Sequence, residues 1–548
     1  MAMKKTNLIS FVCLLLFPLA LLSQEFSRKD SLRGSITEER AWWNLLHYAI
    51  EAKPDISNKS ISGKNTITYK VLKEYQTMQL DLQEPMKILD ITQEGQKLSY
   101  TKEFGAYFVK LIKKQMPGEI NEITVTFGGS PPESRKPPWD GGFVWKKDLN
   151  NNDFVANANQ GIGTSSWLPS KDHPYDEPDE GMEIKIMTPH ELISVANGRL
   201  IAVSNGPGPL KTFHWKVINP INGYGININM ADYVHFNETY KGEKGDLDCD
   251  YYVLSYNLEK ARNQFKQVPK MLEAFEYWFG PYPFYEDGYK LVETPYLGME
   301  HQSSVTYGNA YENGYLGRDL SSTGYGLKFD FIIIHESGHE WFANNLTNND
   351  VADMWIHESF TSYSEALYLD YHFGTEAGNA YCIGHRKKAA NKNTIAGVHG
   401  VNKSGSGDMY MKGAGMIHTL RQIVNNDKKF RSILRGLNRD FYHQTLSGAD
   451  VENYFMEKMG LDLHAFFDQY LRTVDIPVLE YRIKRGVLSY RFTQVVQDFS
   501  IPVKFHINDK EVWLSPSEEW QTYALPAKKA SVKVDENFYV IPVIPEKK

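Results

Sequence analysis

Residues 328–345, KFDFIIIHESGHEWFANN, carry the strongest functional pattern in this chain. Their apolar side chains recur at helical spacing, which predicts a helix over this segment. Residues four apart share one helix face, so His335 and His339 can present two imidazoles to one metal ion. Glu336 lies one position around the helix, where its carboxylate can reach a water at the metal without ligating the metal. The alternative is a pair of structural histidines that bind no ion.

A carboxylate further along the chain can complete this metal site. Glu358 follows His339 after eighteen intervening residues, in a second predicted helix that begins near Asp353. That interval is long enough to end one helix, turn, and return a carboxylate to the two histidines. Two His and one Glu form a catalytic zinc set with an open fourth position for water. We therefore predict one Zn²⁺ ion bound by His335, His339 and Glu358.

The composition is that of an ordinary globular protein. The chain has 548 residues, of which 42% are hydrophobic, and it carries 60 Lys and Arg against 67 Asp and Glu. A formal net charge of -7 lacks the basic excess that would neutralise a phosphate backbone, so nucleic acid is not expected as a partner. The length predicts about three domains.

Strand-like and helical segments divide the chain into regions. Short alternating runs separated by Gly, Pro and Asn turns extend to about residue 246 and predict an antiparallel β domain with one face in water. Helical periodicity then predicts a mainly helical domain, and strand-like runs after Pro477 predict a small β-sandwich. The predicted boundaries are a leader at 1–23, an N-terminal β domain at 24–246, a catalytic domain at 247–476 and a C-terminal β-sandwich at 477–548.

The first residues have the pattern of a secretory signal peptide. Lys4 and Lys5 precede an apolar run, residues 9–22, that ends at Ser23. This run is shorter than the about 20 apolar residues of a transmembrane helix, and no later stretch approaches that length. We therefore expect an exported protein without a transmembrane span, located in a periplasm, at an outer surface or in the medium.

Cysteine catalysis is not expected in the mature chain. Beyond Cys13 in the leader, the sequence contains Cys249 and Cys382 and no C-x-x-C pair. These two thiols can form one disulfide in an oxidising compartment or remain buried and free, and the sequence leaves both possibilities open.

The residues around the predicted metal site resemble those of the M1 aminopeptidases, a branch of the gluzincins. The resemblance rests on H-E-x-x-H followed by eighteen residues and Glu, on Trp341, Phe342 and Asn344, and on the D-x-W-x-x-E-S-F block around Glu358. Members of that family are zinc peptidases with a thermolysin-like fold. The resemblance implies an α+β multidomain protein with an N-terminal β-saddle domain, a thermolysin-like, mainly helical catalytic domain and a small C-terminal β-sandwich.

Residues 297–301, LGMEH, are similar to the family's G-x-M-E-N exopeptidase motif. Leu297 replaces the Gly of that motif and His301 replaces its Asn. By resemblance, the Glu300 carboxylate binds the free α-amine of the substrate, which suits the chemistry because a desolvated ammonium needs an opposite charge nearby. The residues of this segment implied to bind substrate are Gly298, Met299 and Glu300.

Two other segments extend the resemblance over about residues 160–414. Tyr410, in YMKGA, matches the Tyr that steadies the tetrahedral intermediate in the family, and a phenol O–H aimed at an oxyanion is a usual electrophilic device. Gln160, at the start of a segment that continues through Trp167 to Pro178, is implied to face the substrate amine.

Together these matches imply a zinc-dependent aminopeptidase that hydrolyses the N-terminal peptide bond of peptides with a metal-activated water, with Glu336 as general base. Two alternatives remain open. A zinc endopeptidase of the thermolysin type would share the metal set but have no use for Glu300, and a non-catalytic family member would bind peptides without cleaving them. The expected partners are peptides with a free N-terminus, and the sequence does not fix the oligomeric state.

Overall fold

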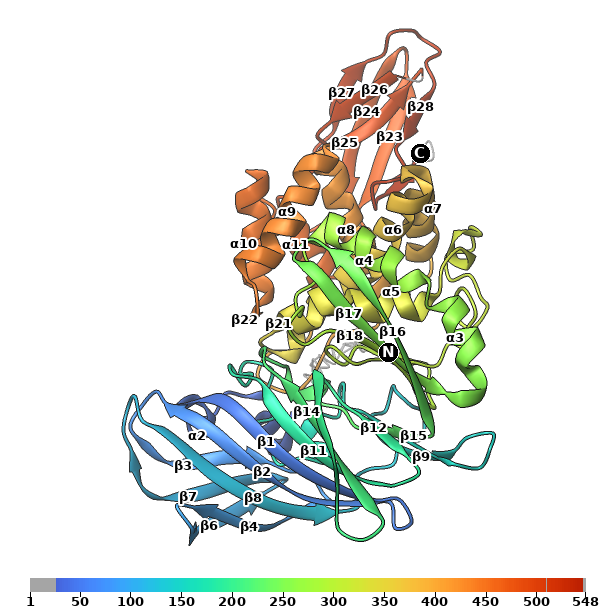
Figure 1. Ribbon diagram of the computed structural model, residues 1–548. Helices are drawn as coiled ribbons and strands as arrows, with labels where there is room; N and C mark the ends of the chain where they lie inside the picture. Colours follow the sequence, from blue (N-terminus) through green and yellow to red (C-terminus); the bar gives the residue numbers. More distant parts are fainter. Residues whose placement is uncertain (1–25, 509, 546–548) are drawn as a thin grey trace, which may run out of the picture.

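The computed structural model describes residues 26–508 and 510–545, which form three parts in chain order (Figure 1). A β-rich N-terminal part and a smaller β-rich C-terminal part lie at opposite ends of a mainly helical middle (Figure 1). This arrangement confirms the predicted α+β multidomain architecture. The predicted leader, residues 1–23, lies outside the described residues.

An eight-stranded sheet forms the largest layer of the N-terminal part, in the order β13-β14-β11-β1-β2-β8-β4-β5. Its described neighbours pair antiparallel, as predicted, except β1 and β11, which run parallel. The strands are β1 (Trp43–Asp55), β2 (Ser60–Val71), β4 (Lys87–Gln93), β5 (Gln96–Lys97), β8 (Ile120–Gly129), β11 (Met182–Pro189), β13 (Arg199–Asn205) and β14 (Leu210–Val217).

Two smaller sheets complete the N-terminal part. One has the order β3-β7-β6, and the other has the order β12-β15-β10-β9. Their strands are β3 (Tyr75–Asp81), β6 (Ser99–Glu103), β7 (Ala106–Gln115), β9 (Gly142–Lys147), β10 (Asp153–Ala158), β12 (Ile193–Val195) and β15 (Asn229–Ala231). The antiparallel pairing of β10 with β15 brings the segment after β10 and the segment before β15 to the same end of the sheet. Gln160 lies in the first of these segments, and a 3-10 turn, η2 (Gly223–Gly225), lies in the second.

A five-stranded sheet, in the order β16-β17-β18-β20-β19, connects the N-terminal part to the helices. Its strands are β16 (Tyr233–Gly242), β17 (Gly245–Leu254), β18 (Tyr289–Glu293), β19 (Gly298–Met299) and β20 (Val305–Tyr307). The predicted domain boundary after Asp246 falls inside β17, which pairs in parallel with β18 over Cys249–Tyr252. The long hairpin of β16 and β17 therefore belongs to the sheet of the middle part (Figure 1).

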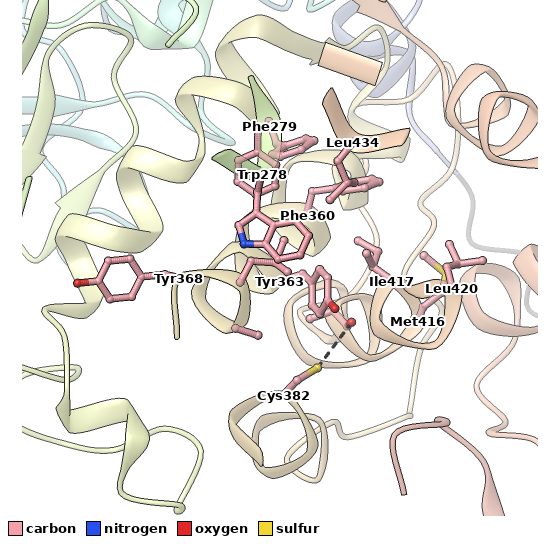
Figure 2. Packing of buried hydrophobic residues seen from close by; sticks show 14 of the residues in the cluster. Trp278, Phe279, Phe360, Tyr363, Tyr368, Cys382, Met416, Ile417, Leu420 and Leu434 are labelled. Atoms are coloured by element: carbon pink, nitrogen blue, oxygen red, sulfur yellow. Dashed lines mark hydrogen bonds between the residues drawn. The ribbon is translucent and has the colours of Figure 1, made fainter. Parts of the chain in front are cut away.

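The middle part consists of helices packed around α6 (Trp355–Phe373), whose first fifteen residues are all buried. Contacts with α6 come from α4 (Gln267–Phe279), α5 (Phe331–Gly338), α7 (Thr375–Arg386) and α8 (Asp408–Val424). The remaining long helices are α9 (Asp427–Asp440), α10 (Gly448–Met459) and α11 (His464–Arg472). Figure 2 shows the core beside α6, where Tyr363 packs among Trp278, Phe360 and Ile417. This packing fixes the helix that carries the predicted third metal ligand.

The C-terminal part is a pair of small sheets, in the orders β27-β24-β23-β29 and β26-β25-β28. Their strands are β23 (Val478–Lys484), β24 (Val487–Thr493), β25 (Val503–Ile507), β26 (Lys510–Leu514), β27 (Gln521–Ala524), β28 (Val532–Val534) and β29 (Ile541–Val543). Arg386 at the end of α7 donates to the Asn537 carbonyl at 3.2 Å, and the Tyr539 amide donates to Thr419 of α8 at 3.0 Å. These bonds attach the C-terminal part to the helices.

The described residues contain two of the three cysteines of the sequence. Cys249 and Cys382 are both buried free thiols, so they do not form a disulfide. None of the helices in the described ranges is long and apolar enough to cross a membrane.

Candidate metal centre and active site

The first two predicted ligands lie at the end of a short buried helix, α5. Asp330 begins this helix, and its carboxylate accepts from the amides of Ile332 and Ile333 at 3.1 and 3.3 Å. His335 and Glu336 lie in the last turn, and His339 follows as the C-terminal cap residue. The predicted helix over residues 328–345 is therefore too long at both ends.

The chain after His339 forms a distorted π-type turn, η5 (Glu340–Asn345), rather than a continuing α-helix. Phe342 has φ −125° and ψ 78°, and Ala343 has φ 156°, a conformation that residues with a side chain rarely adopt. The Ala343 carbonyl accepts from Thr347 Oγ1 at 2.6 Å. The distortion turns the Phe342 carbonyl toward His339, whose Nδ1 lies 3.0 Å from that oxygen.

The third predicted ligand, Glu358, lies in the first turn of α6 and meets both histidines. Its Oε2 lies 3.7 Å from His335 Nε2 and 3.4 Å from His339 Nε2. Donor atoms of all three side chains lie within 4.8 Å of one another, and all three side chains are buried. The structure therefore brings together the three residues that the sequence spacing predicted as ligands.

Two further residues of α6 orient the histidine rings, and the sequence analysis missed both. Glu365 Oε1 lies 2.7 Å from His335 Nδ1, and Thr361 Oγ1 lies 3.1 Å from His339 Nδ1. With Nδ1 of each ring engaged, Nε2 is left for a metal ion. Thr361 and Glu365 follow Glu358 by three and seven residues, which is one helix face, so helical spacing from Glu358 could have found them.

The residues present fit a divalent metal ion. Glu358 Oε2 is buried and makes no hydrogen bond with the described residues, a costly state for a carboxylate oxygen unless a cation completes it. A set of two imidazoles and one carboxylate is the ligand chemistry of catalytic zinc sites.

Glu336 lies beside the ligands without being one of them. It is buried, and its carboxylate lies within 4.8 Å of donor atoms of Glu300 and His339. Burial disfavours the ionised form and raises the pKa of Glu336 above its ordinary value. The backbone of Gly298 in β19 lies directly against this side chain, because an added Cβ would be 3.2 Å from Glu336 Oε1. These contacts place Glu336 where the sequence predicted a general base.

Glu300 is held by residues from two parts of the chain. Gln160 Nε2 donates to Glu300 Oε1 at 2.7 Å and to Glu358 Oε1 at 3.1 Å, so Gln160 does lie at the predicted site. Tyr224 of η2 donates to the same Glu300 Oε1 at 3.2 Å. Asn344 Nδ2 donates to the Glu300 carbonyl at 3.0 Å. A buried carboxylate from the middle part is thereby joined to the N-terminal part.

Tyr410 lies in the first turn of α8 and reaches the metal-ligand cluster from the side of His335. The two rings stack with centroids 6.0 Å apart. Ser359 of α6 donates to the Met409 carbonyl at 2.8 Å, and an added Cβ on Gly413 would be 1.9 Å from Ser359 Oγ. Close packing of α6 on α8 therefore fixes the position of Tyr410. Burial raises the pKa of Tyr410 well above its ordinary value, so the phenol keeps its proton.

Comparison of the sequence with known proteins identifies a family domain in the middle part of the chain. Residues 263–470 match the family model described as the peptidase family M1 domain. This region is a peptidase family M1 domain. It contains the three predicted ligands together with Glu336 and Tyr410, and it also contains Glu300, which follows β19.

The M1 domain has distant curated relatives. The chain is 22% identical over 289 residues to "Probable aminopeptidase 1" of Sulfurisphaera tokodaii, a match that covers 49% of this chain and 36% of the relative. It is 24% identical over 297 residues to "Endoplasmic reticulum aminopeptidase 1" of Mus musculus, covering 52% of this chain and 31% of the relative. The matches thus span about a third of the length of these relatives.

Solved structures of M1 peptidases share the fold over more of the chain. The structure of a mutant M1 zinc metallopeptidase from Deinococcus radiodurans matches with a TM-score of 0.68 at 18% identity, covering 80% of this chain and 96% of that one. A second structure of that protein, bound to a Tyr-Ser-Ala substrate, matches with a TM-score of 0.66 at 18% identity and the same coverage. At such identities the likeness shows the fold.

The predicted site residue Met299 and the motif departure His301 flank Glu300 in the sequence. Met299 is buried in a small apolar cluster with Val144, Ala156, Ala158 and Tyr296, and its contact with substrate stays a prediction. His301 is fully buried, and neither ring nitrogen has a hydrogen-bond partner among the described residues. Burial lowers the pKa of His301 to about 3, so this ring is neutral.

A cavity lies away from the three predicted metal ligands. It has a volume of about 760 Å³ and lies between α7 and the C-terminal strands, lined by residues that include Lys387, Lys533 and Glu536. Both groups of side chains able to hold a metal ion within the described ranges lie instead around His339. The candidate metal site is therefore located by the side chains that can bind a metal ion, and not by the volume of a cavity.

Proposed function

We propose that this protein is a zinc-dependent aminopeptidase that removes the N-terminal residue of peptides. The observation that carries the proposal is the position of Glu300: a buried carboxylate within 4.8 Å of donor atoms of Glu336 and His339. A carboxylate held so close to the proposed hydrolytic centre suits the binding of a free α-ammonium, which would present the first peptide bond to the metal. The aminopeptidase names of the curated relatives support the same activity.

The proposed roles follow from the contacts. His335, His339 and Glu358 would hold one zinc ion, which when bound supplies a Lewis acid that lowers the pKa of water and polarises the carbonyl. Glu336 takes a proton from the attacking water and passes it to the leaving amine, a role that suits a buried carboxyl with a raised pKa. The Tyr410 phenol donates to the carbonyl oxygen as negative charge develops there.

The decisive experiment replaces the proposed base. Glu336→Gln keeps the size of the side chain and leaves the three ligands intact, so it should retain zinc but lose at least about 10²-fold in kcat on an aminoacyl reporter substrate. Zinc is measured on the same sample by mass spectrometry. Substantial turnover by the zinc-loaded variant would refute the assignment.

A substrate pair separates the proposed activity from its alternatives. A peptide with a free N-terminus should be hydrolysed, whereas the same peptide with an acetylated N-terminus should not. Equal rates on the two peptides would indicate an endopeptidase of the thermolysin type. Peptide binding without hydrolysis by zinc-loaded wild-type protein would indicate a non-catalytic member of the family.

We also propose that the chain is exported. Lys4 and Lys5, followed by the apolar run at 9–22, support a cleavable leader. We expect N-terminal sequencing to show that the protein exported by cells begins near Gln24. Recovery of the intact Met1 terminus from the cytoplasmic fraction would contradict export.

A further inference from the structure

Tyr224 lies in the N-terminal part of the chain, outside every motif that identified the site. It is the middle residue of η2 in the sequence NGYG, residues 222–225. Asn222 caps this turn, because its Oδ1 accepts from the Gly225 amide at 2.7 Å. The capped turn therefore fixes the backbone position of Tyr224.

The phenol of Tyr224 reaches the carboxylate proposed to bind the substrate amine. Its O–H donates to Glu300 Oε1 at 3.2 Å, and Gln160 Nε2 donates to the same oxygen at 2.7 Å. Among the described residues, these are the side chains that donate to Glu300, and both use Oε1. The other oxygen, Oε2, is left to accept from a substrate ammonium.

The ring of Tyr224 also has a neighbour in the middle part of the chain. It packs on His357, with centroids 6.4 Å apart and ring planes inclined by 37°. His357 is itself held, because its Nε2 accepts from the Asn348 amide at 2.9 Å. His357 immediately precedes Glu358, so this contact ties η2 to the helix of the third ligand.

The same turn also supports the backbone of Glu300. Asn222 Nδ2 donates to Asn344 Oδ1 at 2.8 Å, and Asn344 Nδ2 donates to the Glu300 carbonyl at 3.0 Å. One turn of the N-terminal part thus reaches both ends of Glu300: the carboxylate through Tyr224 and the carbonyl through Asn222 and Asn344.

We infer that Tyr224 is a positioning residue for the substrate amine: its hydroxyl holds the Glu300 carboxylate in the orientation in which Oε2 accepts the α-ammonium of a peptide. This inference rests on the proposed aminopeptidase function and extends it. A bond to a charged carboxylate is stronger than one between neutral groups, so loss of the donor has a measurable effect. Because the ammonium is bound in both ground state and transition state, the effect falls on KM.

Tyr224→Phe is the first test, since it removes the hydroxyl and keeps the ring against His357. We expect KM for a free-amine substrate to rise about 5- to 20-fold, with kcat within about twofold of wild type and zinc content unchanged. The matched control is Tyr233→Phe, which also removes a buried tyrosine hydroxyl that donates a hydrogen bond, 2.7 Å to the Glu293 carbonyl, but lies outside the site. The control should leave KM unchanged.

A double-mutant cycle shows whether Tyr224 acts through Glu300. In a Glu300→Gln background, where KM is already raised, adding Tyr224→Phe should change KM by less than about twofold. A Tyr224→Phe effect of equal size in both backgrounds, or no KM effect in the wild-type background, overturns the inference. Failure of the proposed function is distinguishable, because zinc-loaded wild-type protein would then hydrolyse no free-amine substrate at all.

Discussion

The backbone of Gly298 lies directly against the side chain of Glu336. A Cβ added to Gly298 would lie 3.2 Å from both Cγ and Oε1 of Glu336, and 2.7 Å from Cγ2 of Ile332. Strand β19 can therefore approach α5 closely because residue 298 has no side chain. This close approach holds the proposed general base in one position.

Gly298→Ala should consequently impair catalysis without removing the metal. The added methyl group must displace Glu336 or Ile332, and a shift of about 1 Å in a catalytic group can cost on the order of 10²-fold in rate. We expect kcat to fall about 10- to 100-fold in steady-state assays while zinc content stays at the wild-type level. The control is Gly128→Ala in β8, where the nearest atom to a new Cβ is at an ordinary 3.5 Å. Wild-type kcat in Gly298→Ala would show that the contact is not restrictive.

Glu365→Gln should weaken zinc binding. Glu365 Oε1 lies 2.7 Å from His335 Nδ1, and the charge on this carboxylate strengthens His335 as a ligand. We expect zinc affinity to fall about 10-fold or more in competition with a fluorescent chelator. The exposed Glu376→Gln on the neighbouring helix α7 provides the control. Unchanged affinity in Glu365→Gln would mean that its charge does not act on the ligand.

Removal of zinc should lower the thermal stability of the protein. The buried Glu358 Oε2 then loses its partner, and ligand binding to the native state no longer contributes to the free energy of unfolding. Calorimetry after treatment with a chelator should show a lower Tm, which added Zn²⁺ restores and added Mg²⁺ does not. A Tm insensitive to the chelator, on a sample shown to be zinc-free, would contradict a metal at these residues.

Glu177 should make stability depend on pH. Burial raises its pKa from 4.5 to about 8. Between these values the unfolded chain loses the proton and the folded chain keeps it, so this group lowers the free energy of unfolding as pH rises, by about 1.4 kcal/mol per pH unit at most. Glu177→Gln removes that dependence and should raise Tm relative to wild type more at pH 8 than at pH 5.

The control for this prediction is Glu180→Gln, which changes an exposed carboxylate three residues away. Its effect on Tm should be small and the same at both pH values. An equal effect of Glu177→Gln at pH 5 and pH 8 would show that the buried carboxyl does not titrate in this range.

The clustering of the three proposed ligands could be predicted from sequence because their geometry is mostly local. His335 and His339 are placed by one turn of helix, and Glu358 by the helix that follows. The spacing of these residues in the sequence is then nearly sufficient to predict that they lie together. The distortion at Phe342 and Ala343 was not predictable in the same way, since their conformation depends on acceptors and donors such as His339 and Thr347 that surround them in the folded chain.

Contacts between distant segments were the least accessible to sequence analysis. Tyr224 and Glu300 are separated by 76 residues, and the turn NGYG has no pattern that indicates a functional site. The sheet to which β17 belongs could not be predicted for a related reason: β17 alternates like the strands before it, and its pairing with β18 is set by tertiary structure. Strand periodicity indicates that a segment is a strand but not which sheet receives it.

The membership of β16 and β17 in the middle sheet has a consequence for recombining this protein with its relatives. A chimera joined at residue 246 would divide a hydrogen-bonded strand between two parents, whereas a crossover just before Tyr233 would transfer the hairpin whole. Even that hybrid would need an incoming N-terminal half with equivalents of Gln160 and Tyr224, because both side chains donate hydrogen bonds to Glu300 of the other half.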